Sequence, residues 1–315
     1  MTYKHLTKLI KENTDKSTFD LTHLIVKSKV IFAVGNGASN VSAMLSSIMS
    51  TCEISNSRYI NIEHFELQDR FVRQGQVISI DELCVSASKI RRKSKNLIFG
   101  SDLILSLSLN LLDGEYIIIE IYEEYYKSMI NRINFSPFAV LLCSLDDDKN
   151  NELIKITPSK THICTLSQKE NYDYIRKADE NGRKTVFASK NKYLLKTANL
   201  LGADFYHFSY LYHIPCIDLN NILLATLAIE SATTLLGTPR PYMYKGISNA
   251  ELPLDLKLHS VSPTILLKIG DGNFKLHRNL NFEKITDVIP SSKPTSNTVF
   301  YGSAEYIHKV KKAMQ

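Results

Sequence analysis

The chain has 315 residues, of which 44% are hydrophobic and 22% are charged, and its formal net charge is +6. This balance is typical of a globular protein with a full hydrophobic core, and it excludes a disordered or fibrous chain. No apolar run approaches the ~20 residues that a membrane-spanning helix needs, and the polar start lacks the apolar block of a signal peptide. We therefore expect a cytoplasmic protein that makes no contact with a membrane.

The five cysteines are widely spaced and form no C-x-x-C pair. Most of them lie in apolar segments, so we expect core thiols and not disulfides or metal ligands. Basic residues cluster at 89–95 and at 308–312. Such runs are usually a solvated helix face or a tail, so nucleic acid is not expected as a partner.

Strand and helix patterns alternate along the first 200 residues. Apolar runs predict buried strands at 30–34, 116–122, 138–145, 161–166 and 185–188, and 58–71 favours a strand followed by a less regular segment. Amphipathic or capped patterns predict helices at 3–12, 79–89, 101–112 and 190–201. Because parallel strands need helical crossovers, this alternation predicts an α/β three-layer sandwich with a mainly parallel sheet. Ligands of such sheets bind at the carboxyl ends of the strands.

The first strand continues directly into Gly35-Asn36-Gly37-Ala38-Ser39-Asn40 and then into a helix pattern. A tight turn before a helix N-terminus aims backbone N–H groups at an anion, and in a phosphate-binding loop a lysine reaches the outer phosphates. Ala38 stands where that cation is expected. The segment therefore keeps the shape of a nucleotide site and lacks its main charge. A plain strand–helix unit with a convenient turn fits the same residues equally well.

The order of motifs resembles the Mur ligase superfamily and, within it, folylpolyglutamate synthase. Asn36, Gly37 and residues 42–45 (SAML) match the family's phosphate loop, G-T-N-G-K-G-S followed by T-S-A-M-L. Residues 74–79 (QGQVIS) are similar to N-G-x-x-I-S, and 221–230 (NILLATLAIE) to N-A-x-x-A-L-A-A-x-E. These elements occur in the family's order, and only the collinear set is specific. The resemblance implies a central domain like that of the Mur ligases, related to P-loop NTPases.

The departures from this resemblance fall on residues that the family uses for ATP, metal or a carbamate. Ala38 replaces the loop lysine, and Asp147 replaces a histidine on a second metal. Glu152 stands where the family has a carbamylated lysine. Glu120 is retained at the position of a glutamate that helps to hold magnesium, but the glycines that follow it in the family are absent.

The resemblance implies two sites, in which ATP and magnesium binding is weak or lost. The candidate nucleotide-binding residues are Gly35, Asn36, Gly37, Ala38, Ser39, Asn40 and Asn221. The candidate metal ligands are Glu120 and Asp147. Glu120 is also compatible with a strand-end acid beside a basic neighbour, and the acid run 146–148 with a solvated turn.

The same comparison divides the chain into a Mur ligase-like domain, 1–246, and a C-terminal remnant, 247–315. The remnant is too short for the family's usual C-terminal α/β domain. Apolar pieces at 264–267 and 298–301 predict a small β-rich unit. A reduced domain leaves apolar surface to cover, so a homodimer or a protein partner is expected, through residues near 247–301. The sequence does not name a small-molecule ligand.

Two functions remain open. In the first, the chain is a degenerate folylpolyglutamate synthase-like protein that acts as a binding or partner protein. A loop cation, a metal ligand and a carbamate each typically stabilise a phosphoryl-transfer transition state by a few kcal/mol, so their loss leaves little ligase activity. In the second, the chain is a divergent ATP-dependent amide ligase that adds an amino acid to a carboxylate substrate. Glu120 and the run 146–148 would then hold metal, and another cation would replace the lysine.

Overall fold

The structure is a computed structural model. It describes residues 1–11, 21, 24–61, 66–93, 100–144, 146–166, 185–188, 219–250, 257–260, 265–268, 281–285 and 298–302.

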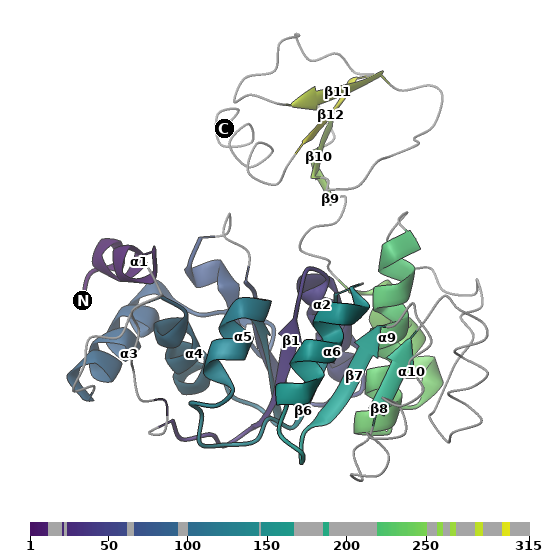
Figure 1. The fold of residues 1–315 in the computed structure, drawn as a ribbon. Coiled ribbons are helices and arrows are strands. Elements are labelled where there is room, and N and C mark those ends of the chain that lie inside the picture. The colour runs from purple at the N-terminus through teal and green to yellow at the C-terminus, as the bar shows by residue number, and fades with distance from the viewer. Residues whose placement is uncertain are drawn as a thin grey trace.

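The described residues up to 188 form one eight-stranded sheet in the order β4-β3-β2-β5-β1-β6-β7-β8 (Figure 1). The strands are β1 Lys29–Val34, β2 Asn56–Tyr59, β3 Phe71–Arg73, β4 Gln76–Val77, β5 Tyr116–Ile121, β6 Ala139–Leu142, β7 His162–Leu166 and β8 Thr185–Ala188. All neighbours from β2 to β8 in this order pair in parallel. Only β3 and β4 are antiparallel. The predicted, mainly parallel sheet is confirmed.

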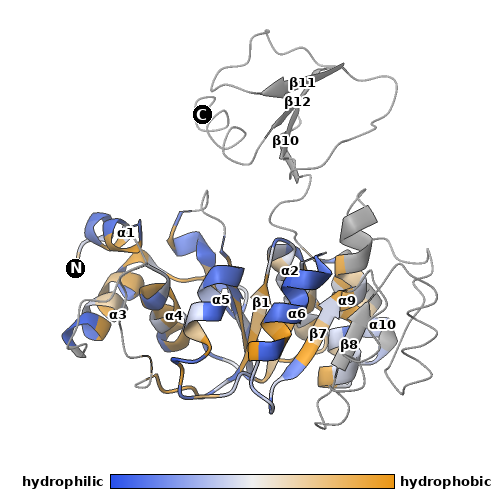
Figure 2. Cartoon of the chain, viewed as in Figure 1, coloured by the Kyte–Doolittle hydropathy of each residue, from blue (hydrophilic) through white to orange (hydrophobic). Residues whose placement is uncertain are grey.

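Helices cover both faces of this sheet. They are α1 Tyr3–Lys11, α2 Ala38–Thr51, α3 Ile80–Lys93, α4 Gly100–Leu111, α5 Glu123–Met129, α6 Asp147–Ile156, α9 Leu219–Leu236 and α10 Arg240–Ser248, and η3 Gln68–Arg70 is a 3-10 turn. Alternate strand residues enter opposite apolar clusters, so Phe32 packs with residues of α1, α3, α4, α5 and α6 while Ile31 packs with those of α2, α9 and α10. Figure 2 shows the apolar strands between helices with hydrophilic outer faces. The three-layer prediction is therefore confirmed.

Local sequence accounts for several helix starts. Ser79 precedes α3, and its hydroxyl accepts a hydrogen bond from the Glu82 N–H at 3.2 Å and donates one to the Glu82 carboxylate at 3.3 Å. In α1, Leu6 and Leu9 are three residues apart and both are buried. None of the helices in the described ranges is long and apolar enough to cross a membrane.

The sequence predicts the segment 58–71 as a strand followed by a less regular segment. It holds the end of β2, the 3-10 turn η3 and the first residue of β3, so β3 and β4 are the strands that the prediction lacks. The β3–β4 hairpin turns at Gln74 and Gly75, whose φ angles of 49° and 83° suit a two-residue turn. The predicted helix at 190–201 lies outside the described residues.

A second sheet follows residue 250. Its described strands, β9 Lys257–Ser260, β10 Ile265–Lys268, β11 Asn281–Ile285 and β12 Thr298–Gly302, pair in the order β11-β12-β10-β9. The strand-like pieces predicted at 264–267 and 298–301 are β10 and β12. Helix α10 runs to Ser248, two residues beyond the boundary expected after Gly246, and Ala250 still packs in the α2 cluster.

Helix α10 lies close against α2 because Gly246 has no side chain. A Cβ atom at Gly246 would come within 2.5 Å of the Ile48 Cα atom. The Ser47 hydroxyl donates to the Gly246 carbonyl at 2.6 Å, which fixes the crossing point. This packing attaches α10, the last described helix, to α2, the helix that follows β1 and the loop 35–37.

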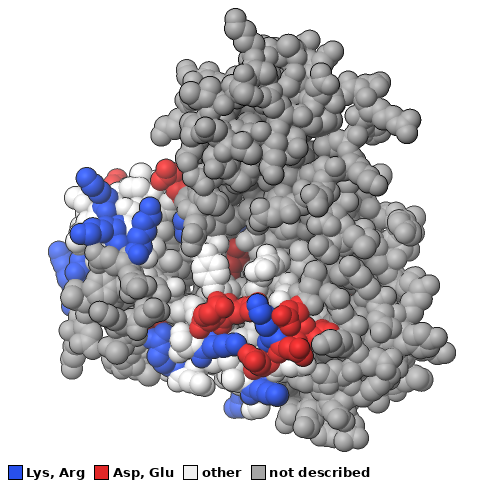
Figure 3. Space-filling model, turned by 45° about the horizontal axis from the view of Figure 1, so that its top comes forward, with Lys and Arg blue, Asp and Glu red and all other residues white. Residues whose placement is uncertain are grey.

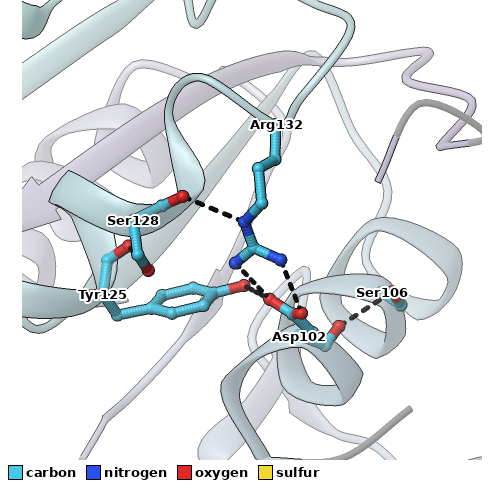
Figure 4. Close-up of polar contacts among 5 residues, drawn as sticks. All are labelled: Asp102, Ser106, Tyr125, Ser128 and Arg132. Carbon is cyan, nitrogen blue, oxygen red and sulfur yellow. Dashed lines mark hydrogen bonds and ion pairs between the residues drawn. The ribbon is translucent and has the colours of Figure 1, made fainter. Parts of the chain in front are cut away.

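A buried ion pair joins α4 to the end of α5 (Figure 4). Asp102, 1% exposed, accepts from Arg132 Nη1 at 2.8 Å and Nη2 at 2.9 Å. The Tyr125 hydroxyl donates to Asp102 at 2.7 Å, and Arg132 Nε donates to the Ser128 carbonyl at 2.9 Å. Burial raises the pKa of Tyr125 well above its usual value, and the Asp102 charge adds to the rise.

We expect Asp102→Ala to lower the free energy of unfolding by about 3 kcal/mol, because it leaves the half-buried Arg132 guanidinium without its counter-charge. Tyr125→Phe should cost about 1 kcal/mol, the usual net value of one hydrogen bond. Urea titration measures both.

The matched control is Glu115→Gln, which breaks a surface pair with Lys29 in which both side chains are about half exposed. Such pairs contribute about 0–1 kcal/mol. An equal loss in the Asp102 and Glu115 variants would contradict a structural role for the buried pair.

Candidate functional site

The predicted strand, turn and helix are present at the carboxyl end of β1. Gly35 adopts a φ of +101°, which favours glycine, and α2 begins three residues later at Ala38. The Ala38 N–H donates to the Gly35 carbonyl at 3.0 Å, and the Val41 N–H to the Gly37 carbonyl at 3.1 Å. The loop backbone thus makes a sharp turn into a helix N-terminus, which is the geometry of an anion site.

Apolar groups pack against this loop. Ala38 is 5% exposed and belongs to the cluster formed by α2, α9 and α10. A Cβ atom at Gly37 would lie 2.4 Å from Leu224 Cδ2 on α9 and 2.9 Å from the Cys143 carbonyl oxygen. The methyl group at the position of the expected cation therefore faces the hydrophobic core, and Leu224 is seated on the loop.

An acid reaches the other end of the loop. Glu123, the first residue of α5, places Oε1 3.3 Å from the Cβ position of Gly35, and the Ser144 backbone nitrogen lies 3.0 Å from the same position. Lys149 Nζ is 3.5 Å from Glu123 Oε2. The ends of β1, β5 and β6 are hydrogen-bonded neighbours in the sheet, which explains why residues so far apart in sequence meet here.

Glu120 is buried beneath α2 with 1% of its surface exposed. Its Oε2 accepts from the Ser39 hydroxyl at 2.6 Å and from the Asn61 N–H at 2.9 Å, and Oε1 accepts from the Ser42 hydroxyl. Burial raises the pKa of the Glu120 carboxyl above its usual value. The hydrogen bonds and the positive charge of Arg58 oppose that rise.

The acid run 146–148 forms the start of α6. Asp146 caps the helix, and its Oδ1 accepts from the N–H groups of Asp148 at 3.0 Å and Lys149 at 3.2 Å. Asp147 and Asp148 occupy the first turn, where negative charge favours the helix dipole. The solvated-turn interpretation is corrected, because these residues form a capped helix N-terminus.

The candidate metal ligand Glu120 is occupied by hydrogen bonds within the chain. Both Glu120 oxygens already accept hydrogen bonds, and the described ranges contain no group of three or more His, Cys, Asp or Glu side chains that could hold a metal ion. Glu152, at the carbamate position of the resemblance, lies on α6 with its side chain 62% exposed and pairs with Lys127 at 2.5 Å.

The remaining candidate nucleotide-binding residues differ in exposure and in the element that carries them. Asn36 is exposed in the turn, Ser39 contacts Glu120, and Asn40 lies half-buried in the first turn of α2. Asn221 lies in the first turn of α9, the helix that packs on α2. The structure therefore brings the loop, Glu120 and α9 together.

Sequence reasoning missed Ser42, Arg58, Glu123 and Leu224. Ser42 follows Ser39 by three residues, so helical periodicity could have placed both hydroxyls on the face towards Glu120. Glu123 and Leu224 meet the loop only through tertiary packing, and no local pattern signals them.

Because the folded pKa of Glu120 is raised, the native state holds this proton at a higher pH than the unfolded chain does. Stability should therefore fall as pH rises from the usual glutamate range through the folded pKa. Glu120→Gln removes this titration and retains hydrogen-bonding groups. We expect the free energy of unfolding of the wild type, relative to the variant, to decline as pH rises above the usual glutamate pKa of about 4. Urea titrations at a series of rising pH values measure this difference in the free energy of unfolding. A difference that increases with pH would show that a nearby cation lowers the pKa of Glu120.

Comparisons with known proteins find matches to this chain by its fold and none by its sequence. No family model matches the sequence, and no curated protein matches it. Solved structures do match. An FPGS–AMPPCP complex has a TM-score of 0.65 at 9% identity, with 100% of this chain and 99% of that chain covered.

Two further solved structures are similar to this chain over its whole length. The apo form of L. casei FPGS has a TM-score of 0.64 at 10% identity, over 100% of this chain and 99% of that one. The bifunctional folylpolyglutamate synthase/dihydrofolate synthase of Yersinia pestis, complexed with AMPPNP and Mn ion, has 0.64 at 11% identity, over 100% and 98%. The chain therefore has the Mur ligase-like fold of folylpolyglutamate synthases, as the order of its motifs predicts.

Proposed function

We propose that this folylpolyglutamate synthase-like chain lacks standard ATP-dependent ligase activity and acts as a binding or partner protein. The observation that supports this most directly is the packing of the phosphate loop. Ala38 is buried in an apolar cluster, and Leu224 lies where a side chain at Gly37 would have to go. A methyl group at the expected cation position and an apolar side chain against the loop both disfavour a phosphate there.

The chemistry of ligation supports the same proposal. Acyl-phosphate formation from ATP needs positive charge on the transferring phosphoryl group. The loop has a methyl group at Ala38, where the cation is expected. Helix α5 places the Glu123 carboxylate near Gly35. Loss of one such stabilising group typically costs a few kcal/mol at a transition state.

One observation favours the alternative, a divergent ATP-dependent amide ligase that adds an amino acid to a carboxylate substrate. Arg58 on β2 interacts electrostatically with Glu120, so a cation is present at the edge of the site. Ser39 and Glu120 are in contact, and a hydroxyl and a carboxylate are ligands that magnesium accepts. Two of the similar structures are complexes with AMPPNP and Mn. In this alternative, Ser39 and Glu120 would hold the metal and Arg58 would act as the cation.

We also propose a cytoplasmic location and association through the C-terminal unit. The described cysteines Cys52, Cys84, Cys143 and Cys164 are free thiols, which suits a reducing compartment. The second sheet has four described strands of four or five residues, and a sheet of this kind is stable when its apolar face is covered, which a partner surface could do.

Calorimetry with Mg-ATP tests the main proposal. We expect no low-micromolar binding by the wild type. The combined variant Ala38→Lys with Leu224→Ala should bind Mg-ATP measurably, because it removes the apolar group from the loop and restores the cation.

The matched control combines Ala38→Lys with Leu235→Ala. Leu235 is buried in the same cluster but lies 11 residues, roughly 16 Å, further along α9. Low-micromolar binding by the wild type would overturn the proposal. Equal gains in both double variants would show that Leu224 does not control the loop.

For association, we expect light scattering to give a mass above that of the monomer, or a pull-down from the source cell to return a stable partner. A monomer at all protein concentrations, together with an empty pull-down, would contradict association.

A further inference from the structure

Glu123 combines burial, negative charge and contact with the phosphate loop. It is 9% exposed, and its Oε1 lies 3.3 Å from the Cβ position of Gly35. Gly35 is the residue at which β1 turns towards the N-terminus of α2. The carboxylate is thus held beside the residue at which the chain turns into the loop.

The charge of Glu123 is only partly compensated. Lys149 forms an ion pair with it at 3.5 Å, and the Lys149 side chain is 53% exposed, so solvent screens the pair. Helices α5 and α6 are in contact, and both have acids in their first turns, Glu123 and Glu124 on α5 and Asp147 and Asp148 on α6. Figure 3 shows acidic and basic side chains interleaved on this face of the molecule.

We propose that Glu123 determines the ligand specificity of the loop by excluding phosphate-bearing ligands. An anion gains from the loop N–H groups and the helix dipole, but a fixed carboxylate a few ångströms away opposes it. The exclusion rests on the proposed function, since it assumes a loop that no longer serves ATP. It goes further because it assigns the selection against anions to one residue outside the loop.

The test uses the full-length chain and sodium tripolyphosphate as the probe, in calorimetry without magnesium. Glu123→Gln keeps the size and polarity of the side chain and removes its charge. We expect the variant to bind tripolyphosphate at least about tenfold more tightly than the wild type. Glu124→Gln, at the exposed neighbouring position of α5, is the matched control and should leave the affinity unchanged.

Salt dependence separates a charge effect from a packing effect. Screening shortens the range of the interaction from about 8 Å at 0.15 M salt to about 3 Å at 1 M. The gain of Glu123→Gln should therefore shrink as salt rises, whereas a gain from altered packing should persist. Should Glu123→Gln unfold, Lys149→Gln provides the second variant, which should weaken tripolyphosphate binding because it removes the partly compensating cation.

The inference falls if Glu123→Gln binds no more tightly than the wild type, if Glu124→Gln gains as much, or if the gain is independent of salt. These outcomes are distinct from failure of the proposed function. A wild type that binds Mg-ATP at low micromolar affinity would overturn that function and still leave the charge effect of Glu123 measurable.

Discussion

Burial of both faces of the central strands is the constraint on which the rest of the structure depends. In β5, Ile117, Ile119 and Ile121 enter one apolar cluster, while Tyr116 and Ile118 enter the other. Period-two alternation therefore directs Glu120 towards α2, on the face where Tyr116 and Ile118 pack. A carboxylate in this position needs donors, and α2 supplies the hydroxyls of Ser39 and Ser42. The geometry around Glu120 follows from the sheet, whether or not a ligand ever binds there.

The loop at 35–40 shows how packing alone can hold the geometry of an anion site. Gly35 keeps the positive φ that turns the chain, and Gly37 keeps room for a close neighbour. That neighbour is Leu224, an apolar side chain of α9, and Ala38 extends the same cluster. Because these contacts stabilise the turn from within, the loop conformation does not require a bound anion. Loop shape alone is therefore weak support for nucleotide binding.

Sequence patterns predicted the parts of the fold that local chemistry decides. The apolar runs predicted β1, β5, β6, β7 and β8, and Ser79 with Glu82 marked the start of α3. The acid run 146–148 was ambiguous because aspartates favour both turns and helix N-termini, and the cap made by Asp146 decided between them. The short hairpin strands β3 and β4 lack the apolar runs that identify buried strands. At the site, Ser42 was within reach of helical periodicity, whereas Glu123 and Leu224 depended on packing between distant segments.

The similarity to folylpolyglutamate synthase structures at 9–12% identity has a physical explanation. Cores accept many apolar substitutions as long as volume and pattern are kept, whereas a site that binds charge needs particular groups. The end of β5 and the helix after it show both cases. Up to Ile121 the strand is packed on both faces, and its pattern agrees with the resemblance. Tyr122 is exposed, and α5 then returns to the core through Tyr125, Tyr126 and Met129. Glu123, on the same helix, places a carboxylate beside Gly35. One helix thus supplies apolar residues to the core and a charge to the loop, and these two parts can differ independently between chains that share the fold.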